Sequence, residues 1–374
     1  MLPLLIFFFF FPSSSVDSYT YSNGTTPQDA ASLPFPAMYV LGDSLVDSGN
    51  NNFLPTLAKA NFFPYGSDFP RGPTGRFTNG RTVVDFIAEF LGLPYVPPYA
   101  SLMREASMGG NQASGLNYAS ASCGILTDTG KNLGGCMALA EQINLLLLTI
   151  NVELPRYFPT KADISNHLSK SLFVISVGSN DYLVNYLRPF SPTRALYPPR
   201  VFARLLVISL CQQIQRLYQM GARKLLLFEI GPIGCIPSIR KYSYLLNNKG
   251  FCVEEVNRFA AIYNYQLHNM IQYLRLSLPD ATLIVGRVFN AAYDAILNPS
   301  SYGFSDASEA CCMTWANGTS ACIPGFPPCG DPFQHYFWDG FHLTEAVYRL
   351  VAEDCINGSS ICNPNISELV DSLQ

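Results

Sequence analysis

A serine, an asparagine and an Asp-x-x-His pair are the residues of this sequence whose types could together perform acyl transfer. Ser44 follows the apolar run 37–41 in VLGDSLVDSGNNN, Asn180 ends another apolar run in VGSND, and Asp339 and His342 lie in WDGFHLTEA. A serine hydroxyl needs an adjacent base to take its proton, and a histidine oriented by an aspartate is such a base. An asparagine amide can donate a hydrogen bond to the oxyanion that forms. Together these residues predict a serine hydrolase.

Taken singly, each of these residues has an ordinary structural interpretation. GDS and GSND are turn-forming sequences, and the default role of a histidine is in the core or at the solvated surface. His335 has no acidic partner at triad spacing, and we interpret it as a surface or substrate-facing residue. We interpret two other histidines as structural and three nearby aspartates as turn caps or supporting acceptors: His167, His268, Asp43, Asp47 and Asp181. The prediction of chemistry therefore rests on the conjunction of Ser44, Asn180 and Asp-x-x-His.

Five apolar runs that end in glycine or polar residues predict the strands of a sheet: 37–41, 116–120, 172–177, 224–230 and 282–289. Helical patterns lie between them, at 82–94 with a capping-box start, and over longer spans at 200–220 and 253–277. Strands separated by helices are typical of a parallel sheet covered on both faces. Ligands of such sheets bind beyond the carboxyl ends of the strands, so we expect Ser44 and Asn180 at that edge.

The composition describes a globular chain with little charge. Of its 374 residues, 48% are apolar and 13% are charged, about half of the usual charged share of roughly 25%. The net charge of −4 comes without a basic run, which excludes a nucleic-acid partner of the usual basic kind. We predict a single α/β domain over 36–356 and a C-terminal tail over 357–374.

Residues 1–18, MLPLLIFFFFFPSSSVDS, are typical of a secretory signal peptide. Their apolar core of about ten residues is too short for a membrane helix, which needs roughly 20. A hydrophobic N-terminal anchor or a mis-assigned start are the alternatives, since no Lys or Arg precedes the apolar core. No later segment reaches spanning length without a charge, so we expect no stable membrane span in the mature chain.

The cysteines and glycosylation sequons agree with export. Eleven cysteines without a Cys-x-x-Cys zinc pattern favour disulfides, and three near-neighbour pairs are predicted: Cys123–Cys136, Cys235–Cys252 and Cys355–Cys362. The pairing within a fourth cluster stays open: Cys311, Cys312, Cys322 and Cys329. Cys211 is the expected free thiol. Asn-x-Ser/Thr sequons stand at Asn23, Asn317, Asn357 and Asn365. The predicted location is secreted, extracellular or in the cell wall.

The sequence resembles the GDSL esterase/lipase family of the SGNH hydrolase superfamily, and in particular its secreted plant-type members. The resemblance rests on GDSLVDSGNNN, GLNYASASCGIL, VGSND and WDGFHLTEA, in that order, and runs from about Pro36 to Asp354. It implies a flavodoxin-like three-layer α/β sandwich, the SGNH hydrolase fold, with about five parallel strands and helices on both faces. It also implies that neither a metal nor a cofactor is used.

Carried over residue by residue, the resemblance implies Ser44 as the nucleophile, His342 as the general base and Asp339 as the residue that orients His342. The main-chain N–H of Ser44 and the side chain of Asn180 would donate to the oxyanion. A third donor would be a main-chain N–H of the second block.

The second and last blocks depart from the family pattern. Ala121 and Ser122 stand where relatives often have glycines, which blurs the assignment of the third oxyanion donor. Gly115 precedes the predicted strand and Gly124 follows it, so Gly124 is the expected donor. Leu343 replaces the proline that usually follows the catalytic histidine, which could loosen the histidine loop without removing a reacting group.

The leading hypothesis is a secreted serine hydrolase that cleaves a lipid, an acetylated glycan or a small acyl ester through an acyl-enzyme on Ser44. One alternative is an acyltransferase that uses the same acyl-enzyme, and another is an extracellular glycan-binding protein with little turnover. The segment 61–77, rich in aromatic residues, proline and glycine, could line a pocket or pack as a long loop. The expected partner is an ester substrate, and the oligomeric state stays open.

Overall fold

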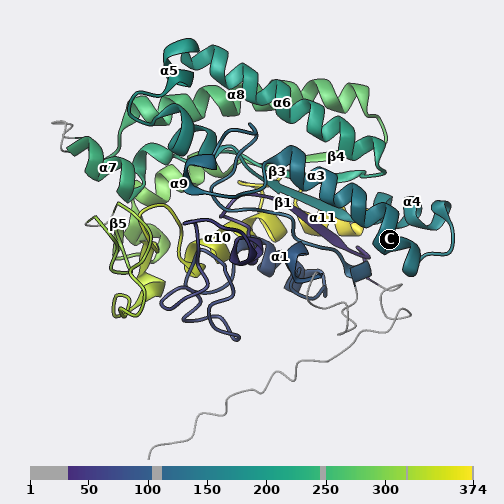
Figure 1. The fold of residues 1–374 in the computed structure, drawn as a ribbon, viewed down its shortest axis with the longest axis horizontal. Helices are drawn as coiled ribbons and strands as arrows, with labels where there is room; N and C mark the ends of the chain where they lie inside the picture. Colours follow the sequence, from purple (N-terminus) through teal and green to yellow (C-terminus); the bar gives the residue numbers. More distant parts are fainter. Residues whose placement is uncertain (1–32, 103–111, 245–249, 317–318, 373–374) are drawn as a thin grey trace, which may run out of the picture. The chain divides into compact units, whose positions relative to one another are not determined.

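A parallel four-stranded sheet forms the centre of the structure, a computed structural model (Figure 1). The strands are β1 (Met38–Gly42), β2 (Leu172–Ser176), β3 (Lys224–Phe228) and β4 (Thr282–Gly286), and they pair in the order β1-β2-β3-β4. The structure describes residues 33–102, 112–244, 250–316 and 319–372. The predicted signal peptide, residues 1–18, lies outside the described residues.

The fifth predicted strand, 116–120, runs beside β1 but does not form a regular strand. The amide of Val40 donates to Leu116 O at 3.0 Å, and the amide of Tyr118 donates to Val40 O at 2.7 Å. On its other side the segment meets Pro97 and Pro98, where only an isolated bridge forms, since proline has no N–H for a ladder. The resulting spatial order, 116–120, β1, β2, β3, β4, is the flavodoxin-like order.

Helices cover both faces of the sheet, because the side chains of each strand alternate between two hydrophobic layers. Tyr39 and Leu41 of β1 pack with one set of helices, α3 (Leu139–Leu148), α4 (Lys161–Lys170), α6 (Pro199–Gln219) and α8 (Glu254–Ser277). Met38 and Val40 pack with the other set, α1 (Val83–Phe90), α10 (Glu345–Asn357) and α11 (Ile366–Asp371). Figure 1 shows α6 and α8 on one side of the sheet and α1 and α10 on the other.

Three further α-helices and two short strands complete the described regular structure, apart from short 3₁₀ and π segments. They are α5 (Pro192–Leu196), α7 (Pro237–Tyr244), α9 (Val288–Leu297), β5 (Asp306–Ala310) and β6 (His335–Phe337). β5 and β6 pair in parallel as a separate two-stranded sheet. The helical patterns expected at 82–94, 200–220 and 253–277 are confirmed as α1, α6 and α8.

Five disulfides cross-link the described chain. The three predicted pairs are confirmed, and the open cluster is resolved as Cys311–Cys329 and Cys312–Cys322. Cys211 is the free cysteine of the described residues.

The segment 357–374, expected as a C-terminal tail, packs against the domain in its described part. Ile366 and Leu369 of α11 are buried in the same hydrophobic layer as α1 and α10. The Cys355–Cys362 disulfide ties the end of α10 to the segment that leads into α11. The apolar face of α11 and this cross-link together make the segment part of the folded unit.

Candidate active site

Ser44, His342 and Asp339 come together at the carboxyl edge of the sheet. Ser44 Oγ lies 2.8 Å from His342 Nε2, and His342 Nδ1 lies 2.8 Å and 2.9 Å from the two oxygens of Asp339. Ser44 follows β1, whereas the other two residues lie between β6 and α10. Because an ionised carboxylate can only accept, Nδ1 carries a hydrogen and Nε2 is left to accept from the serine hydroxyl.

Tyr65 holds the other side of the Asp339 carboxylate. Its hydroxyl donates to Asp339 Oδ2 at 2.6 Å, and the amides of Phe341 and His342 donate to Oδ1 at 2.8 Å each. Burial raises the pKa of Asp339, but the interactions with His342, the Tyr65 hydroxyl and the Phe341 amide outweigh it and lower that pKa below its ordinary value. Burial and the adjacent carboxylate raise the pKa of Tyr65 well above its ordinary value. The pair is therefore an ionised aspartate held by a neutral tyrosine.

The sharp turn at Ser44 requires a glycine at position 42. Gly42 has φ +153°, and a Cβ there would lie 2.1 Å from Ser176 O on β2. Its peptide is clamped by Gln142, whose Oε1 accepts from Gly42 N and whose Nε2 donates to Gly42 O, both at 2.8 Å. The amide of Asp43 donates to Ser176 O at 3.0 Å. Ser44 thus stands on a turn that is fixed by hydrogen bonds from Gln142 and to Ser176.

The polar residues after Ser44 fasten the second sequence block to the first. Asp47 accepts from the amides of Gly49 and Asn50 at 2.7 Å and 2.8 Å, and from the amide of Ala121 at 3.2 Å. Asn50 Nδ2 donates to the carbonyls of Asn117 and Ala119, and Asn51 Nδ2 donates to that of Ala121: these bonds measure 2.9, 2.8 and 3.0 Å. The side chains of the stretch VDSGNNN therefore form buried hydrogen bonds within the fold, whereas a solvent-exposed turn would bond mainly to water.

Burial perturbs two aspartates of this first block. It raises the pKa of Asp43 to about 7 and that of Asp47 to about 6, although hydrogen bonds from backbone amides lower both pKa values. Both residues serve as acceptors for turn amides, Asp43 for the amide of Leu45 at 3.1 Å. The interpretation of these residues as turn caps is confirmed.

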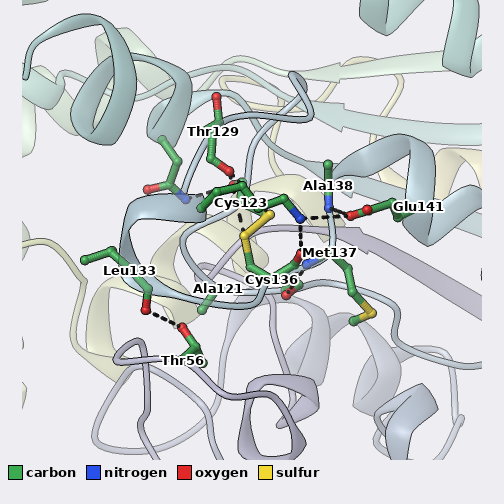
Figure 2. Close-up of a disulfide and its surroundings, with 12 residues drawn as sticks. Thr56, Ala121, Cys123, Thr129, Leu133, Cys136, Met137, Ala138 and Glu141 are labelled. Carbon is green, nitrogen blue, oxygen red and sulfur yellow. Dashed lines mark hydrogen bonds and ion pairs between the residues drawn. A yellow bond between two sulfur atoms is a disulfide. The ribbon is translucent and has the colours of Figure 1, made fainter. Parts of the chain in front are cut away.

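Asn180 and Ser122 border the same cavity as Ser44. Asn180 Nδ2 donates to Cys123 O at 3.1 Å, which orients the amide and uses one of its two hydrogens. Ser122 has φ +69°, a conformation that side chains other than glycine rarely adopt. Glycine adopts this backbone conformation easily, which explains why a glycine would also suit position 122. Figure 2 shows the Cys123–Cys136 disulfide, which links the residue after Ser122 to the segment before α3.

Gly124, the expected third donor, lies elsewhere. A Cβ at Gly124 would stand 2.3 Å from Asp181 Oδ2, and among the described residues Gly124 is not part of the cavity wall. Asp181 accepts from the amides of Ile125 and Leu126 at 2.8 Å and 3.1 Å. The glycine at 124 is therefore required by the close approach of the Asp181 carboxylate, and this packing role is separate from the oxyanion donation expected of Gly124.

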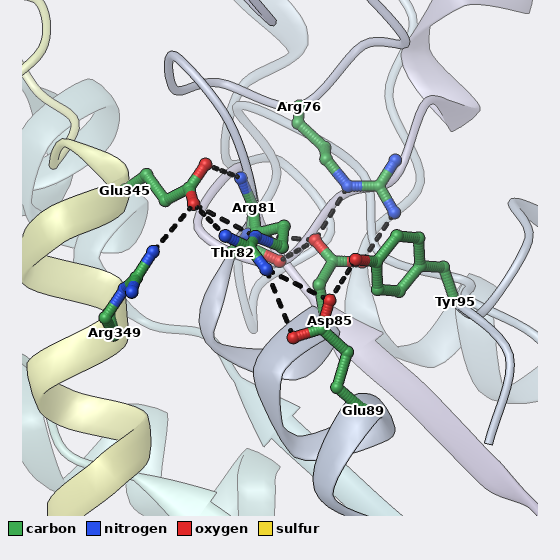
Figure 3. Close-up of polar contacts among 8 residues, drawn as sticks. All are labelled: Arg76, Arg81, Thr82, Asp85, Glu89, Tyr95, Glu345 and Arg349. Atoms are coloured by element: carbon green, nitrogen blue, oxygen red, sulfur yellow. Dashed lines mark hydrogen bonds and ion pairs between the residues drawn. The ribbon is translucent and has the colours of Figure 1, made fainter. Parts of the chain in front are cut away.

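The start of α10, just after His342, is anchored by a buried glutamate. Glu345 accepts from the Arg81 side chain at 2.6 Å and 2.9 Å and from the Arg81 amide at 2.9 Å, and Figure 3 shows these contacts beside α1. The histidine loop itself is held by Trp338 N, which donates to His342 O at 2.8 Å, and by a bridge between Phe337 and Leu343. The loop is thus secured without the proline that Leu343 replaces.

A cavity of about 460 Å³ is lined by Ser44, Asn180 and His342 among others. Apart from them its wall is mostly apolar, with side chains that include Leu57, Phe228, Ile233, Ala292, Ile296 and Tyr336. A pocket of this size falls in the range that holds small organic ligands.

Comparison with known proteins identifies the family of the chain. A model of the family GDSL-like Lipase/Acylhydrolase matches residues 38–355. The chain belongs to the GDSL lipase/acylhydrolase family. It is 45% identical to the GDSL esterase/lipase 7 of Arabidopsis thaliana over 328 residues, which cover 87% of this chain and 88% of that protein. It is 42% identical to the GDSL esterase/lipase At1g71691 of the same plant over 337 residues, 89% and 85% of the two chains. The protein is accordingly a carboxylic ester hydrolase with the α/β fold expected of the family.

The other histidines of this GDSL hydrolase lie apart from the triad. Burial lowers the pKa of His167 to about 4, and its Nε2 lies 3.1 Å from the Tyr39 hydroxyl, as expected of a structural residue. His268 Nε2 lies 2.6 Å from Glu229 Oε1. His335 is half-buried in β6, and in the described part of the chain it does not border the cavity.

Two of the four sequons lie in described residues. Asn357 is exposed, whereas Asn365 is buried, caps α11 and donates through Nδ2 to Gly358 O at 2.9 Å. Asn23 and Asn317 lie outside the described residues. The described chain contains no helix that is both long and apolar enough to cross a bilayer.

Proposed function

We propose that the protein hydrolyses carboxylic esters through an acyl-enzyme on Ser44. The observation that carries the proposal is the 2.8 Å separation of Ser44 Oγ and His342 Nε2, with Nδ1 on Asp339. As Oγ attacks the ester carbonyl, Nε2 takes its proton, and the carboxylate stabilises the imidazolium. The imidazolium then protonates the leaving alcohol, and a water deprotonated by the same nitrogen releases the acid.

The negative charge on the carbonyl oxygen needs donors that are in place before the reaction. We assign this role to the main-chain N–H groups of Ser44 and Ser122 and to the second Nδ2 hydrogen of Asn180. Ser122 replaces Gly124 in this assignment because it borders the cavity beside Ser44 and Asn180. The donor is a main-chain group, so a serine can supply it as well as a glycine.

Hydrolysis is proposed ahead of acyl transfer and of glycan binding with little turnover. The relatives are named esterase/lipases, and the triad geometry is complete, which a protein that only binds would not need. An acyltransferase would use the same Ser44 ester but would pass the acyl group to an alcohol. Product analysis with and without an added alcohol separates the two, because transfer yields a new ester at the expense of free acid.

We further infer that the protein acts outside the reducing cytosol. The pattern of residues 1–18 and the five disulfides support export, since disulfides persist in oxidising compartments. N-terminal sequencing of protein recovered from the medium of expressing plant cells tests this inference. Recovery only inside the cells would contradict it.

The central test compares purified wild-type protein with Ser44→Ala on p-nitrophenyl esters. We expect kcat to fall by a factor on the order of 10⁴ or more in the variant, because the nucleophile is lost while binding is kept. A fluorophosphonate probe should label the wild type and leave the variant unlabelled. Equal turnover by both proteins would show that the acyl-enzyme on Ser44 is wrong.

A further inference from the structure

The cavity beside Ser44 continues along the carboxyl edge of the sheet, away from the reacting groups. Its wall follows the strand ends in their spatial order: Ser44 after β1, Ser179 after β2, Glu229 after β3 and Val288 after β4. Adjacent strands lie about 4.8 Å apart, so the three steps from β1 to β4 give a length of about 14 Å. This length suits an extended chain that starts at Ser44.

The far part of the cavity is covered by one face of α9. Val288, Ala292 and Ile296 all line it, four residues apart, and such positions share a helix face over about 12 Å of its length. Phe228 and Tyr336 add aromatic surface from the end of β3 and from β6. Ala292 is the smallest side chain of the helical stripe, so open space in this part of the cavity depends on it.

The charged residue in this part already has its partners. Glu229 lies 2.6 Å from His268 Nε2, and its other oxygen accepts from the amide of Phe289 at 3.1 Å. Its carboxylate therefore does not call for a cationic ligand. Apolar walls gain free energy from burying hydrocarbon and gain little from a hydroxyl-rich sugar, which would lose its bonds to water.

The opposite end of the cavity is open to solvent. Leu57 borders it and is 82% exposed, and Ser320 and Ala321 border it from the disulfide-linked loop. A leaving alcohol can depart by this end without passing α9.

We propose that the α9 part of the cavity binds the acyl chain, and that the substrates are esters of medium- or long-chain carboxylic acids rather than acetylated glycans. This inference rests on the proposed hydrolysis through Ser44. It makes Ala292 and Ile296 the residues that set the preferred chain length. A short acetyl group would leave most of this apolar space unused.

The test measures kcat/KM for p-nitrophenyl acetate, butyrate, octanoate and laurate. For the wild type we expect a rise of up to about fourfold for each methylene that becomes buried. Ala292→Phe fills the space of two or more methylenes, so the octanoate-to-acetate ratio should fall at least about tenfold. Ile296→Ala should move the optimum to a longer ester.

Asn290→Phe is the matched control, because it adds the same ring to the exposed side of α9. Its ratio should equal that of the wild type. Thermal unfolding and labelling by the fluorophosphonate probe report whether each variant folds. If Ala292→Phe does not fold, Ile296→Ala still tests the inference.

Three outcomes would overturn the inference. In the first, Ala292→Phe folds and keeps the wild-type ratio, or Ile296→Ala leaves the optimum unchanged. In the second, chain length matters only in a series of alkyl acetates, which would place the alcohol under α9. In both cases hydrolysis through Ser44 would stand. In the third, the wild type turns over no ester, and the proposed function fails together with the acyl subsite.

Discussion

Replacing Tyr65 with phenylalanine removes one oxygen from the support of the triad and keeps the ring. In the wild type this hydroxyl donates to Asp339 Oδ2 at 2.6 Å and accepts from the Cys322 amide at 3.2 Å. Both Tyr65 and Asp339 are fully buried, so water cannot replace either bond without a rearrangement. The variant leaves a buried carboxylate oxygen and a buried amide without these partners.

The expected loss of stability is about 2–3 kcal/mol at neutral pH, the usual cost of losing a hydrogen bond to a buried charged group. The pKa of Asp339 lies below its ordinary value, so this contribution is present above about pH 3.9, the unfolded pKa, and is lost as the pH falls through the folded pKa. The difference between wild type and variant should therefore shrink in acid.

The effect on catalysis should be smaller than that of losing a triad member. His342 keeps both contacts to Asp339, and two amides still hold Oδ1. A carboxylate that is less well fixed misplaces the imidazole, and we expect kcat to fall about tenfold with KM unchanged.

Tyr118→Phe provides a matched control. Tyr118 is equally buried, and its hydroxyl donates to Thr149 Oγ1 at 2.8 Å, outside the cavity wall. Denaturant unfolding at neutral pH and at about pH 3, with kcat and KM on one soluble ester, measures all three proteins. If Tyr65→Phe kept wild-type kcat, or if its stability deficit did not shrink in acid, the argument that Tyr65 positions an ionised Asp339 would be refuted.

Three further predictions concern other groups of the site and the surface. Asn180→Ala should lower kcat for ester hydrolysis by about 10²–10³, the usual cost of one oxyanion donor, and a smaller loss in steady-state kinetics would count against that role. Burial raises the folded pKa of Asp43 to about 7, so the folded state binds the extra proton and wild-type stability should fall as the pH rises from about 4 to 7; Asp43→Asn should show a flatter profile in denaturant titrations, and parallel profiles would contradict this assignment. Asn357 should carry a glycan and Asn365 should not, because Asn365 Nδ2 is buried and bonded to Gly358 O; peptide mass spectrometry after enzymatic deglycosylation would contradict the prediction by finding the reverse.

The strands and the positions of the candidate reacting residues could be predicted because their signals are local. An apolar run followed by small polar residues marks both a buried strand and its carboxyl end, so Ser44 and Asn180 could be placed at one edge of the sheet. The near-neighbour disulfides follow from spacing in the same way. The pairing of the four cysteines at 311–329 could not be predicted, because four cysteines allow three pairings and local spacing does not choose among them.

The features that could not be predicted depend on contacts between distant residues or on backbone conformation. Tyr65 is 274 residues from Asp339 in the sequence. Its aromatic segment gives no indication that one tyrosine contacts that aspartate. The irregularity of 116–120 arises from its neighbours Pro97 and Pro98. Ser122, the oxyanion donor proposed in place of Gly124, has a positive φ that its residue type alone does not indicate.

The disulfide-linked loop 311–329 connects the proposed chemistry with the proposed export. The amides of Cys311 and Cys312 donate to the carbonyls of Phe337 and Trp338, and the amide of Cys322 donates to the Tyr65 hydroxyl.

The same loop lies against the region of Asp339, where the amide of Gly340 donates to Ser320 O at 2.9 Å. The two local strands, β5 and β6, have only five and three residues, too few to hold this region by themselves. The cross-links Cys311–Cys329 and Cys312–Cys322 therefore secure the loop that positions both Asp339 and its tyrosine. A loop that depends on oxidised cysteines in this way is suited to an oxidising compartment, which agrees with the proposed export.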